Sequence, residues 1–202
     1  MTKGILIVIS APSGAGKTTL VRELHKIMPE VLYTISLTTR SPRRGEKNGE
    51  DYHYVTPEEF KKKVAENDFI EYAEVHGYWY GTPKSFVDES LKKGKVILLD
   101  IDVQGGRQIK KIYPESVLVF VAPPSLEVLE SRLRARGQDD EKTIQKRLKN
   151  AIQELDQSKY YDYLIVNDEI PHAVDQLRGV IIAEKSRMKR TEFKLSKVLN
   201  VQ

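Results

Sequence analysis

Cysteine is absent from this chain of 202 residues, and its absence excludes several classes of protein. Without thiols there is no disulfide scaffold, no Cys-ligated zinc or iron–sulfur cluster, and no thiol nucleophile. Long hydrophobic runs are missing as well, since no stretch approaches the roughly 20 apolar residues of a membrane span. The first apolar run, residues 5–9, is too short for the core of a signal peptide. We therefore expect a cytoplasmic protein with no membrane partner.

A large net charge of either sign is also lacking, because the formal charge is +4 and Lys and Glu are mixed along most of the chain. This balance suits a small polyanionic substrate at least as well as a nucleic acid and decides for neither. The length is enough for one α/β domain with insertions, whose core needs neither a disulfide nor a structural metal.

Short apolar runs at residues 5–9, 96–99, 117–121 and 163–166 recur between segments whose apolar residues have helical spacing. Each run is nearly continuous, which is typical of strands buried on both faces. The pattern predicts an α/β fold, with a mostly parallel sheet and helices on both of its faces.

Two segments differ from this pattern. Residues 33–95 are polar and rich in tyrosine, charge and turn signals, which indicates a small inserted domain. Within it, Asn48-Gly49 followed by residues 52–55 predicts a hairpin leading into a strand. Residues 125–157 are highly charged and predicted to be helical throughout.

A phosphate-binding loop lies between the first apolar run and the first amphipathic helix, where residues 11–18 read APSGAGKT. They fit the pattern G-x-x-x-x-G-K-[ST], except that Ala11 replaces the first glycine. Gly14 and Gly16 let backbone N–H groups point at phosphate oxygens. Lys17 can reach the β- and γ-phosphates of a nucleotide, and the Thr18 hydroxyl can ligate Mg²⁺.

An acidic residue stands at the end of another predicted strand, where Asp100 follows the apolar run 96–99. Ligands of open α/β sheets bind at the carboxyl edge of the strands. Asp100 is therefore expected to hold Mg²⁺ through a bound water, although a role as cap of the following helix stays open.

The residues now resemble those of a known family. The strings SLTTRSPRRGE at 36–46, NGEDY at 48–52, FIE at 69–71, YGT at 80–82, LDIDVQG at 99–105 and APPS at 122–125 are similar to guanylate kinases and occur in family order. The similarity runs from about residue 5 to about residue 185. It implies a P-loop kinase fold with a mostly parallel five-stranded sheet, an inserted NMP-binding α+β subdomain and a helical lid.

The resemblance implies a division into a core domain (1–32, 96–124 and 158–202), a GMP-binding insertion (33–95) and a lid (125–157). It implies transfer of the γ-phosphoryl of ATP to GMP, and to dGMP as well, in purine metabolism. The ATP-binding residues would be Ala11, Pro12, Ser13, Gly14, Ala15, Gly16, Lys17, Thr18 and Thr19, with Asn167 at the adenine edge.

The GMP site needs a phosphate clamp and a guanine reader. Arg40 and Arg43 offer planar forks that suit phosphate, and Tyr52 and Tyr80 offer phenolic donors. By resemblance, all four contact the GMP phosphate. Guanine presents two N–H donors and the acceptor O6, which match a carboxylate and hydroxyls. The resemblance assigns these roles to Glu71, Ser36 and Thr82, with Asp102 as a second acidic contact.

The lid supplies arginines. Ser125 is the expected N-cap of a helix whose apolar stripe is Leu126, Leu129 and Leu133. At 100° per residue, Arg132 and Arg136 flank this stripe and can point inward together. Arg147 resembles a third arginine of the family. Together with Lys17, these three would be catalytic by neutralising charge on the transferred phosphoryl group.

Two rival interpretations stay open at this stage. One is a related P-loop kinase with another acceptor, such as ribose 1,5-bisphosphate. The other is a guanylate-kinase-like binding module without catalysis, although such modules typically lack the phosphate loop. The expected partners are ATP, GMP and Mg²⁺, with no nucleic acid. A homo-oligomer and a role for the tail, residues 189–202, are left undecided.

Overall fold

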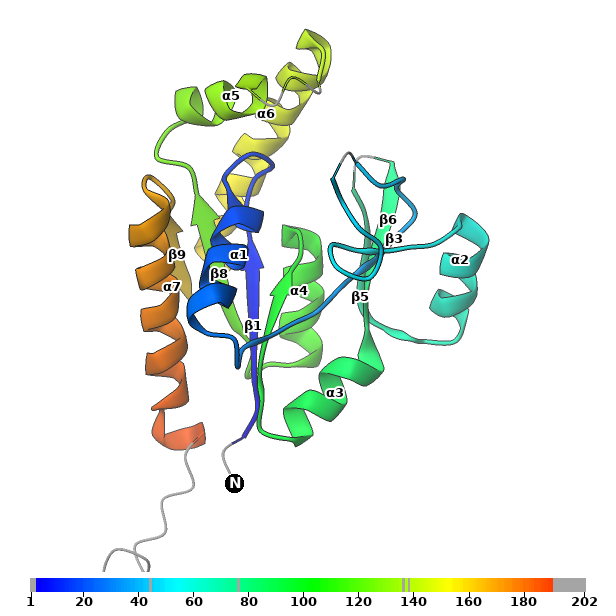
Figure 1. The fold of residues 1–202 in the computed structure, drawn as a ribbon, viewed down its shortest axis with the longest axis vertical. Helices are drawn as coiled ribbons and strands as arrows, with labels where there is room; N and C mark the ends of the chain where they lie inside the picture. Colours follow the sequence, from blue (N-terminus) through cyan, green and yellow to red (C-terminus); the bar gives the residue numbers. More distant parts are fainter. Residues whose placement is uncertain (1–2, 44, 76, 136, 138, 191–202) are drawn as a thin grey trace, which may run out of the picture.

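The structure, a computed structural model, describes residues 3–43, 45–75, 77–135, 137 and 139–190 (Figure 1). Its main sheet has five strands in the order β2-β7-β1-β8-β9, and every pairing is parallel. The strands are β1 (Ile5–Ser10), β2 (Leu32–Tyr33), β7 (Val96–Asp100), β8 (Val117–Ala122) and β9 (Tyr163–Val166). The predicted parallel five-stranded sheet is therefore confirmed, and the four apolar runs supply four of its strands.

The central strand β1 shows why the apolar runs are continuous. Ile5, Ile7 and Ile9 belong to the core cluster on one face of the sheet. Leu6 and Val8, which alternate with them, belong to the cluster on the other face. Because neighbouring side chains of a strand point to opposite faces, a strand covered on both sides must be apolar at every position.

The prediction of burial on both faces is wrong for β9. This strand is at the edge of the sheet, and Leu164 and Val166 are 60% and 43% exposed. Ile165 is buried in the first core cluster, and Tyr163 packs against the same cluster while only partly buried. Its apolar sequence resembles that of β1, so the run alone did not distinguish an edge strand from a central one.

Helices cover both faces of the main sheet (Figure 1). On one face, α1 (Lys17–Ile27) packs beside α7 (Ile170–Lys185), and both contribute to the first core cluster. On the other face lie α3 (Lys84–Lys92) and α4 (Val103–Ile112), with Val87 and Ile109 fully buried in the second cluster. The carboxyl ends of the strands are left uncovered by these four helices.

A second sheet forms within residues 33–95, in the order β4-β3-β6-β5. Its strands are β3 (Leu37–Thr38), β4 (His53–Tyr54), β5 (Phe69–Val75) and β6 (Tyr78–Pro83), and helix α2 (Pro57–Ala65) lies beside them (Figure 1). A capping box begins α2, because Thr56 and Glu59 each accept from the other's backbone N–H.

The hairpin predicted at Asn48-Gly49 is wrong, because β4 pairs with β3 in parallel. The turn residues close a local loop in which the Gly49 N–H donates to the Tyr52 carbonyl at 2.8 Å. The Asn48 side chain accepts from the Tyr54 N–H at 3.1 Å. Because of this loop, the chain does not fold straight back along β3, and β4 runs in the same direction as β3.

Both ends of the 33–95 segment lie on the main sheet. Tyr33 belongs to β2, and Val87 of α3 is buried in the second core cluster. The strands of the second sheet lie between β2 and α3 in the sequence. Since β2 pairs with β7 and α3 packs on the main sheet, these two elements anchor the second sheet to the core.

The segment 125–157, predicted to be helical throughout, is mostly helical but consists of two helices, α5 (Leu126–Ala135) and α6 (Glu141–Asp156), followed by the short helix η1 (Gln157–Tyr160). Asp140 is the N-cap of α6, so the prediction of one uninterrupted helical segment is wrong. Ser125 caps α5 by accepting from the Val128 N–H at 3.2 Å. Leu129 and Leu133 are fully buried and pack against Ala151 of α6. The α5–α6 pair rises above the carboxyl edge of the main sheet (Figure 1).

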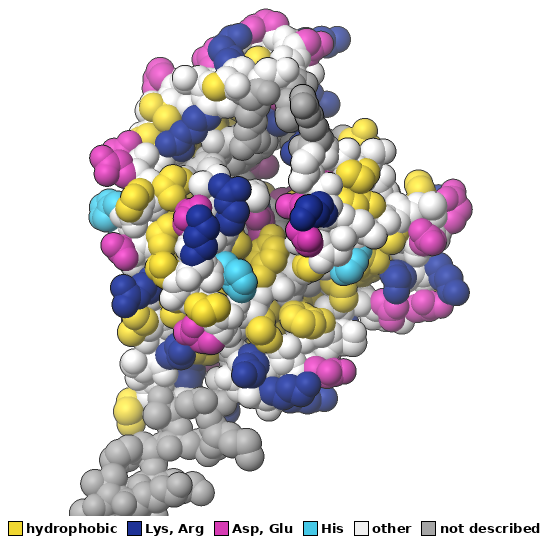
Figure 2. All heavy atoms as spheres, in the orientation of Figure 1, with side chains coloured by type: hydrophobic (Ala, Val, Ile, Leu, Met, Phe, Trp, Pro, Cys, Tyr) yellow, Lys and Arg dark blue, Asp and Glu magenta, His cyan; other side chains and the backbone are white. Residues whose placement is uncertain are grey.

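Basic and acidic side chains are interspersed over the face shown in Figure 2, as the mixed sequence suggests. Within the described part of the chain, no helix is both long enough and apolar enough to cross a bilayer. The tail from residue 191 onward lies outside the described residues.

Candidate active site

The phosphate loop has the predicted setting, between the end of β1 and the start of α1. Gly14 and Gly16 have φ values of 98° and 90°, in the left-handed region that favours glycine. Gly16 is also the N-cap of α1, so the loop leads directly into the positive end of a helix dipole. Such an arrangement is suited to binding phosphate.

Lys17 and Asp100 form an ion pair at the carboxyl edge of the sheet. The Lys17 ammonium also donates to the Ile101 carbonyl at 3.1 Å. Asp100 does not cap the following helix, because Asp102 is the N-cap of α4 and accepts from the Gly105 N–H at 2.8 Å. The alternative reading of Asp100 as a helix cap is therefore wrong.

One cleft of about 200 Å³ joins the phosphate loop to the second sheet. Its lining from the predicted nucleotide sites comprises Ala11, Pro12, Ser13, Gly14, Gly16, Lys17, Thr18, Ser36, Arg43, Tyr52, Glu71, Tyr80, Asp100 and Asp102. Strings that are far apart in the sequence thus meet in one place. Ala15, Thr19, Arg40 and Thr82 do not line this cleft, and of these Ala15, Arg40 and Thr82 are buried beside it.

The predicted guanine reader is a buried carboxylate–hydroxyl pair. Glu71 is only 4% exposed, and its Oε1 accepts from the Thr82 hydroxyl at 2.6 Å. The Ser36 hydroxyl lies 3.5 Å from that of Thr82. Burial raises the pKa of Glu71 to about 7, with a smaller contribution from the nearby Asp102 carboxylate. A ligand that donates two N–H groups would favour the ionised form of Glu71.

Gly105 is part of this pair's surroundings, and the sequence reasoning did not single it out. A Cβ at position 105 would lie 2.6 Å from Oε2 of Glu71 and 3.2 Å from Ile101. The carboxylate therefore rests against the first turn of α4, in space that any side chain at position 105 would take. Its place in the same family-like string as Asp102, three residues further on, was the only available signal.

Arg40 is held by a dense network. Its guanidinium donates to the Tyr80 hydroxyl at 3.2 Å, to the Ser41 carbonyl at 2.7 Å and to both Glu46 oxygens at 3.0 Å. Glu46 also accepts from the Tyr54 hydroxyl at 2.7 Å. The sequence reasoning placed Glu46 in the family-like string but gave it no role. In this conformation Glu46 balances the charge of Arg40.

Arg43 and the tyrosines are more available to a ligand. The Arg43 backbone N–H donates to Glu46 at 2.7 Å, which fixes the loop, while its side chain is exposed and lines the cleft. Tyr52 also lines the cleft. Burial raises the pKa of its phenol, and the negative charge of Asp100 raises it further. Its phenol therefore stays protonated and can donate a hydrogen bond.

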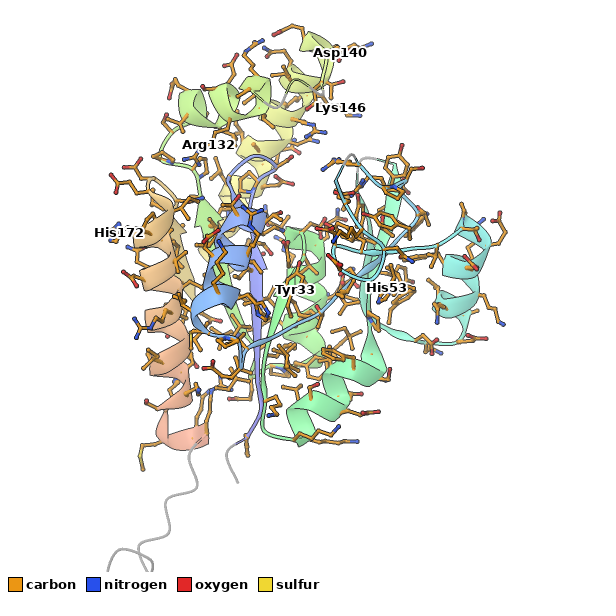
Figure 3. The ribbon with its side chains drawn as sticks, in the orientation of Figure 1. Tyr33, His53, Arg132, Asp140, Lys146 and His172 are labelled. Carbon is orange, nitrogen blue, oxygen red and sulfur yellow. The ribbon has the colours of Figure 1, made fainter. Side chains whose placement is uncertain are left out.

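Two of the three predicted lid arginines reach the phosphate loop. Arg132 donates to the Asn167 carbonyl at 3.0 Å and to the Ala15 carbonyl at 3.5 Å. Figure 3 shows Arg132 between α5 and the loop. Arg147 donates to the Ser13 hydroxyl at 3.2 Å and pairs with Asp139 at 3.1 Å. The third, Arg136, lies outside the described residues.

Asn167 supports the loop from beneath. It is fully buried, and its amide donates to the Ala15 carbonyl at 2.6 Å. Its side-chain oxygen has no hydrogen-bond partner among the described residues. The side chain does not line the cleft in this conformation, and the adenine contact stays a prediction.

Glu154 of α6 is a further acidic group that the sequence reasoning missed. It lines the cleft together with the phosphate loop. Burial raises its pKa to about 7, and the charge of Asp102 contributes in the same direction. A glutamate in a charged helix gives no signal by itself, because most such residues face solvent.

The fold and the loop define a class of protein. A parallel sheet with a phosphate loop after its central strand, helices on both faces and an ion-paired lysine is a P-loop kinase fold. The crystal structure of a guanylate kinase from Anaplasma phagocytophilum has this fold, with a TM-score of 0.83 and 32% sequence identity. The match covers 100% of this chain and 96% of that one.

Sequence comparison identifies the family. The guanylate kinase family model matches residues 3–184. The guanylate kinase of Carboxydothermus hydrogenoformans is 47% identical over 195 residues, covering 96% of each chain. That of Geobacter sulfurreducens is 43% identical over 199 residues, covering 98% of each. The chain belongs to the guanylate kinase family.

Proposed function

We propose that this chain transfers the γ-phosphoryl group of ATP to GMP or dGMP, giving ADP and GDP or dGDP. The reaction belongs to purine nucleotide metabolism, in the cytoplasm. One observation carries this proposal: a single cleft unites the phosphate loop, the Lys17–Asp100 pair and the buried Glu71 carboxylate. The first two suit a nucleoside triphosphate, and the third suits the N–H edge of guanine.

Mg²⁺ would fit the donor set at the edge of the sheet. Thr18 and Asp100 line the same cleft and offer a hydroxyl and a carboxylate oxygen, which are ligands that Mg²⁺ prefers. Among the described residues, no group of three or more His, Asp or Glu side chains gathers to form a complete cage. That agrees with an ion held by one or two protein oxygens plus substrate phosphates. When bound, it neutralises phosphate charge.

The transfer itself needs position and charge more than covalent chemistry. Lys17 reaches the β- and γ-phosphates from the loop, while the N–H groups around Gly14 and Gly16 hold the phosphate chain. Arg43, Tyr52 and Tyr80 hold the acceptor phosphate at the other side of the cleft. An oxygen of the acceptor phosphate then attacks the γ-phosphorus in line, and the bond to the β-phosphate oxygen breaks, releasing ADP.

The lid arginines neutralise charge on the transferred group. Arg132 and Arg147 already donate to the Ala15 carbonyl and the Ser13 hydroxyl of the phosphate loop, which would hold the triphosphate. We propose the same role for Arg136. Closing the α5–α6 pair over the cleft would also exclude water, which protects ATP from hydrolysis.

The cleft argues against the two rival functions. A sugar phosphate such as ribose 1,5-bisphosphate would leave the buried Glu71–Thr82 pair without N–H donors to meet. A binding module without catalysis would have no use for Lys17 held against Asp100 beneath the loop. Both observations favour the kinase reaction with a guanine acceptor.

The experiment is ADP release from ATP·Mg²⁺ with GMP, dGMP, AMP, CMP, UMP, dTMP or ribose 1,5-bisphosphate as acceptor. Turnover on the order of 1–100 per second with guanine nucleotides alone is the expected result. Turnover with a different acceptor would overturn the guanine assignment and keep the phosphate loop. No turnover with any acceptor, while ATP still binds, would overturn the kinase assignment.

A further inference from the structure

A second hollow lies between the lid and the second sheet, on the far side of the residues assigned to the acceptor phosphate. Its volume is about 270 Å³. Arg43 and Tyr80 line both this hollow and the active-site cleft, so the two spaces meet at these side chains. From the lid, α6 contributes Lys146 and Arg147. We call this space the lid hollow.

The lid hollow is cationic. Its charged lining consists of Arg40, Arg43, Lys146 and Arg147, and none of the described residues that line it carries a carboxylate. Two of the four charges are balanced nearby, since Arg40 pairs with Glu46 at 3.0 Å and Arg147 with Asp139 at 3.1 Å. The hollow is thus a place where an anion would be attracted from both the lid and the second sheet.

The other two cations have no such balance. The ammonium of Lys146 and the guanidinium of Arg43 have no hydrogen-bond or ion-pair partner among the described residues. They come from different parts of the protein, one from α6 and one from the loop after β3. In Figure 3, Lys146 lies on the lid helix α6, and the lid faces the second sheet. Bringing these like charges together is unfavourable unless an anion lies between them.

We propose that Lys146 is a substrate-binding residue, whose ammonium contacts the phosphate monoester of the acceptor nucleotide from the lid side. This inference rests on the proposed function. Arg43 and Tyr80 hold that phosphate from the second sheet, and Lys146 completes the set when the lid approaches. The acceptor phosphate then draws the lid inward by direct contact, in addition to the contacts of Arg132 and Arg147 with the phosphate loop.

The test compares Lys146→Met with Lys142→Met. Both lysines are exposed and lie on α6, but Lys142 does not line the lid hollow. Methionine keeps the length of the side chain and favours helix, so neither change should disturb folding. The affinity for GMP is measured by calorimetry with ADP·Mg²⁺ present, and the affinity for guanosine is measured in the same way. Steady-state KM for GMP and for ATP is measured in parallel.

Loss of a charge-assisted hydrogen bond should weaken GMP binding about 10- to 100-fold in Lys146→Met. Guanosine binding and KM for ATP should stay within about twofold, since neither involves the acceptor phosphate. Lys142→Met should behave as the wild type, and Lys146→Arg should restore most of the GMP affinity. The loss of GMP affinity in Lys146→Met should also be smaller at high salt, because salt screens the attraction between the exposed Lys146 ammonium and the phosphate.

Two results would overturn the inference. Equal GMP affinity in Lys146→Met and Lys142→Met would show that Lys146 is a solvated surface residue. Equal losses for GMP and guanosine in Lys146→Met would show an effect that does not pass through the phosphate. Failure of the proposed function would be seen separately, because the wild-type protein would then bind GMP but form no GDP.

Discussion

Replacing Glu71 with glutamine should weaken the use of GMP far more than the use of ATP. The substitution keeps the size of the side chain and an oxygen that can accept from Thr82. It replaces one carboxylate oxygen by an NH₂ group, which would face an N–H donor of guanine. Since Glu71 is 4% exposed, water cannot easily make up for the lost acceptor.

The magnitude follows from that burial. A buried polar group left without a partner costs about 1–3 kcal/mol, which corresponds to a factor of about 5–150 in binding. We expect KM for GMP to rise by about this factor in Glu71→Gln. KM for ATP should change less than about twofold, because the phosphate loop is unaltered.

The pH dependence gives a sharper test. Burial raises the pKa of Glu71 to about 7, so the carboxyl is largely protonated below that pH and cannot accept both N–H groups of guanine. KM for GMP in the wild type should therefore rise as the pH falls from 8 to 6. The second pKa of a phosphate monoester is about 6 and contributes to the same rise.

Glu71→Gln separates these two titrations, because the variant retains only the one that belongs to the phosphate. The assay is ADP release at varied GMP concentration from about pH 6 to 9, for both proteins. The reasoning fails if the two profiles of KM against pH have the same shape, or if KM for GMP is unchanged by the substitution. The free energy of unfolding gives a further check. Because the pKa of Glu71 is raised from 4.5 to about 7 in the folded protein, the contribution of this carboxyl to the free energy of unfolding should decrease as the pH rises from about 4.5 to 7.

Three further substitutions have distinct expected outcomes. Lys17→Ala should lower turnover more than about 100-fold with an unchanged circular dichroism spectrum, since it removes a cation that acts on the transferred group. Gly105→Ala should raise KM for GMP but not for ATP, because the added methyl group displaces the Glu71 carboxylate. Glu184→Gln should lower the free energy of unfolding, measured in denaturant, by about 3–5 kcal/mol, because it breaks the buried pair with Arg190. Although burial opposes it, hydrogen bonds hold the pKa of Glu184 below 4.5, so the difference should vanish as the pH falls through that lower value.

Much of the fold could be predicted because its signals are local. The continuous run of β1 and the glycines after it determine a buried strand, a positive-φ loop and a helix start within about 20 residues. Ser125 could be predicted as a helix cap for the same reason, and the structure confirms it. In each case the neighbours in sequence are also the neighbours in space.

The features that could not be predicted depend on distant partners. The two-residue strand β2 is too short to give a pattern and exists because it pairs with β7. The exposure of β9 depends on its place at the edge of the sheet, which its own residues do not encode. The parallel pairing of β4 depends on how the loop before it folds, and the turn residues Asn48-Gly49 predicted only that the chain bends.

The candidate site shows the same division. Residues with a side chain suited to phosphate or guanine, such as Lys17 and Glu71, could be chosen from their type and their strings. Gly105 and Lys146 could not be chosen in this way. Gly105 matters because its missing side chain leaves space for the Glu71 carboxylate, and Lys146 matters because Arg43 lines the same hollow.

The described chain begins and ends at one place, at the amino edge of the main sheet. The Lys3 N–H donates to the Arg190 carbonyl at 3.3 Å, and the Arg190 side chain donates to the Glu115 carbonyl at 2.8 Å. The phosphate loop, which lines the active-site cleft, lies between the end of β1 and the start of α1, at the opposite edge of the sheet. A tether attached at either end would therefore leave substrate access open. Force applied between residues 3 and 190 would act first on the hydrogen bond that joins them.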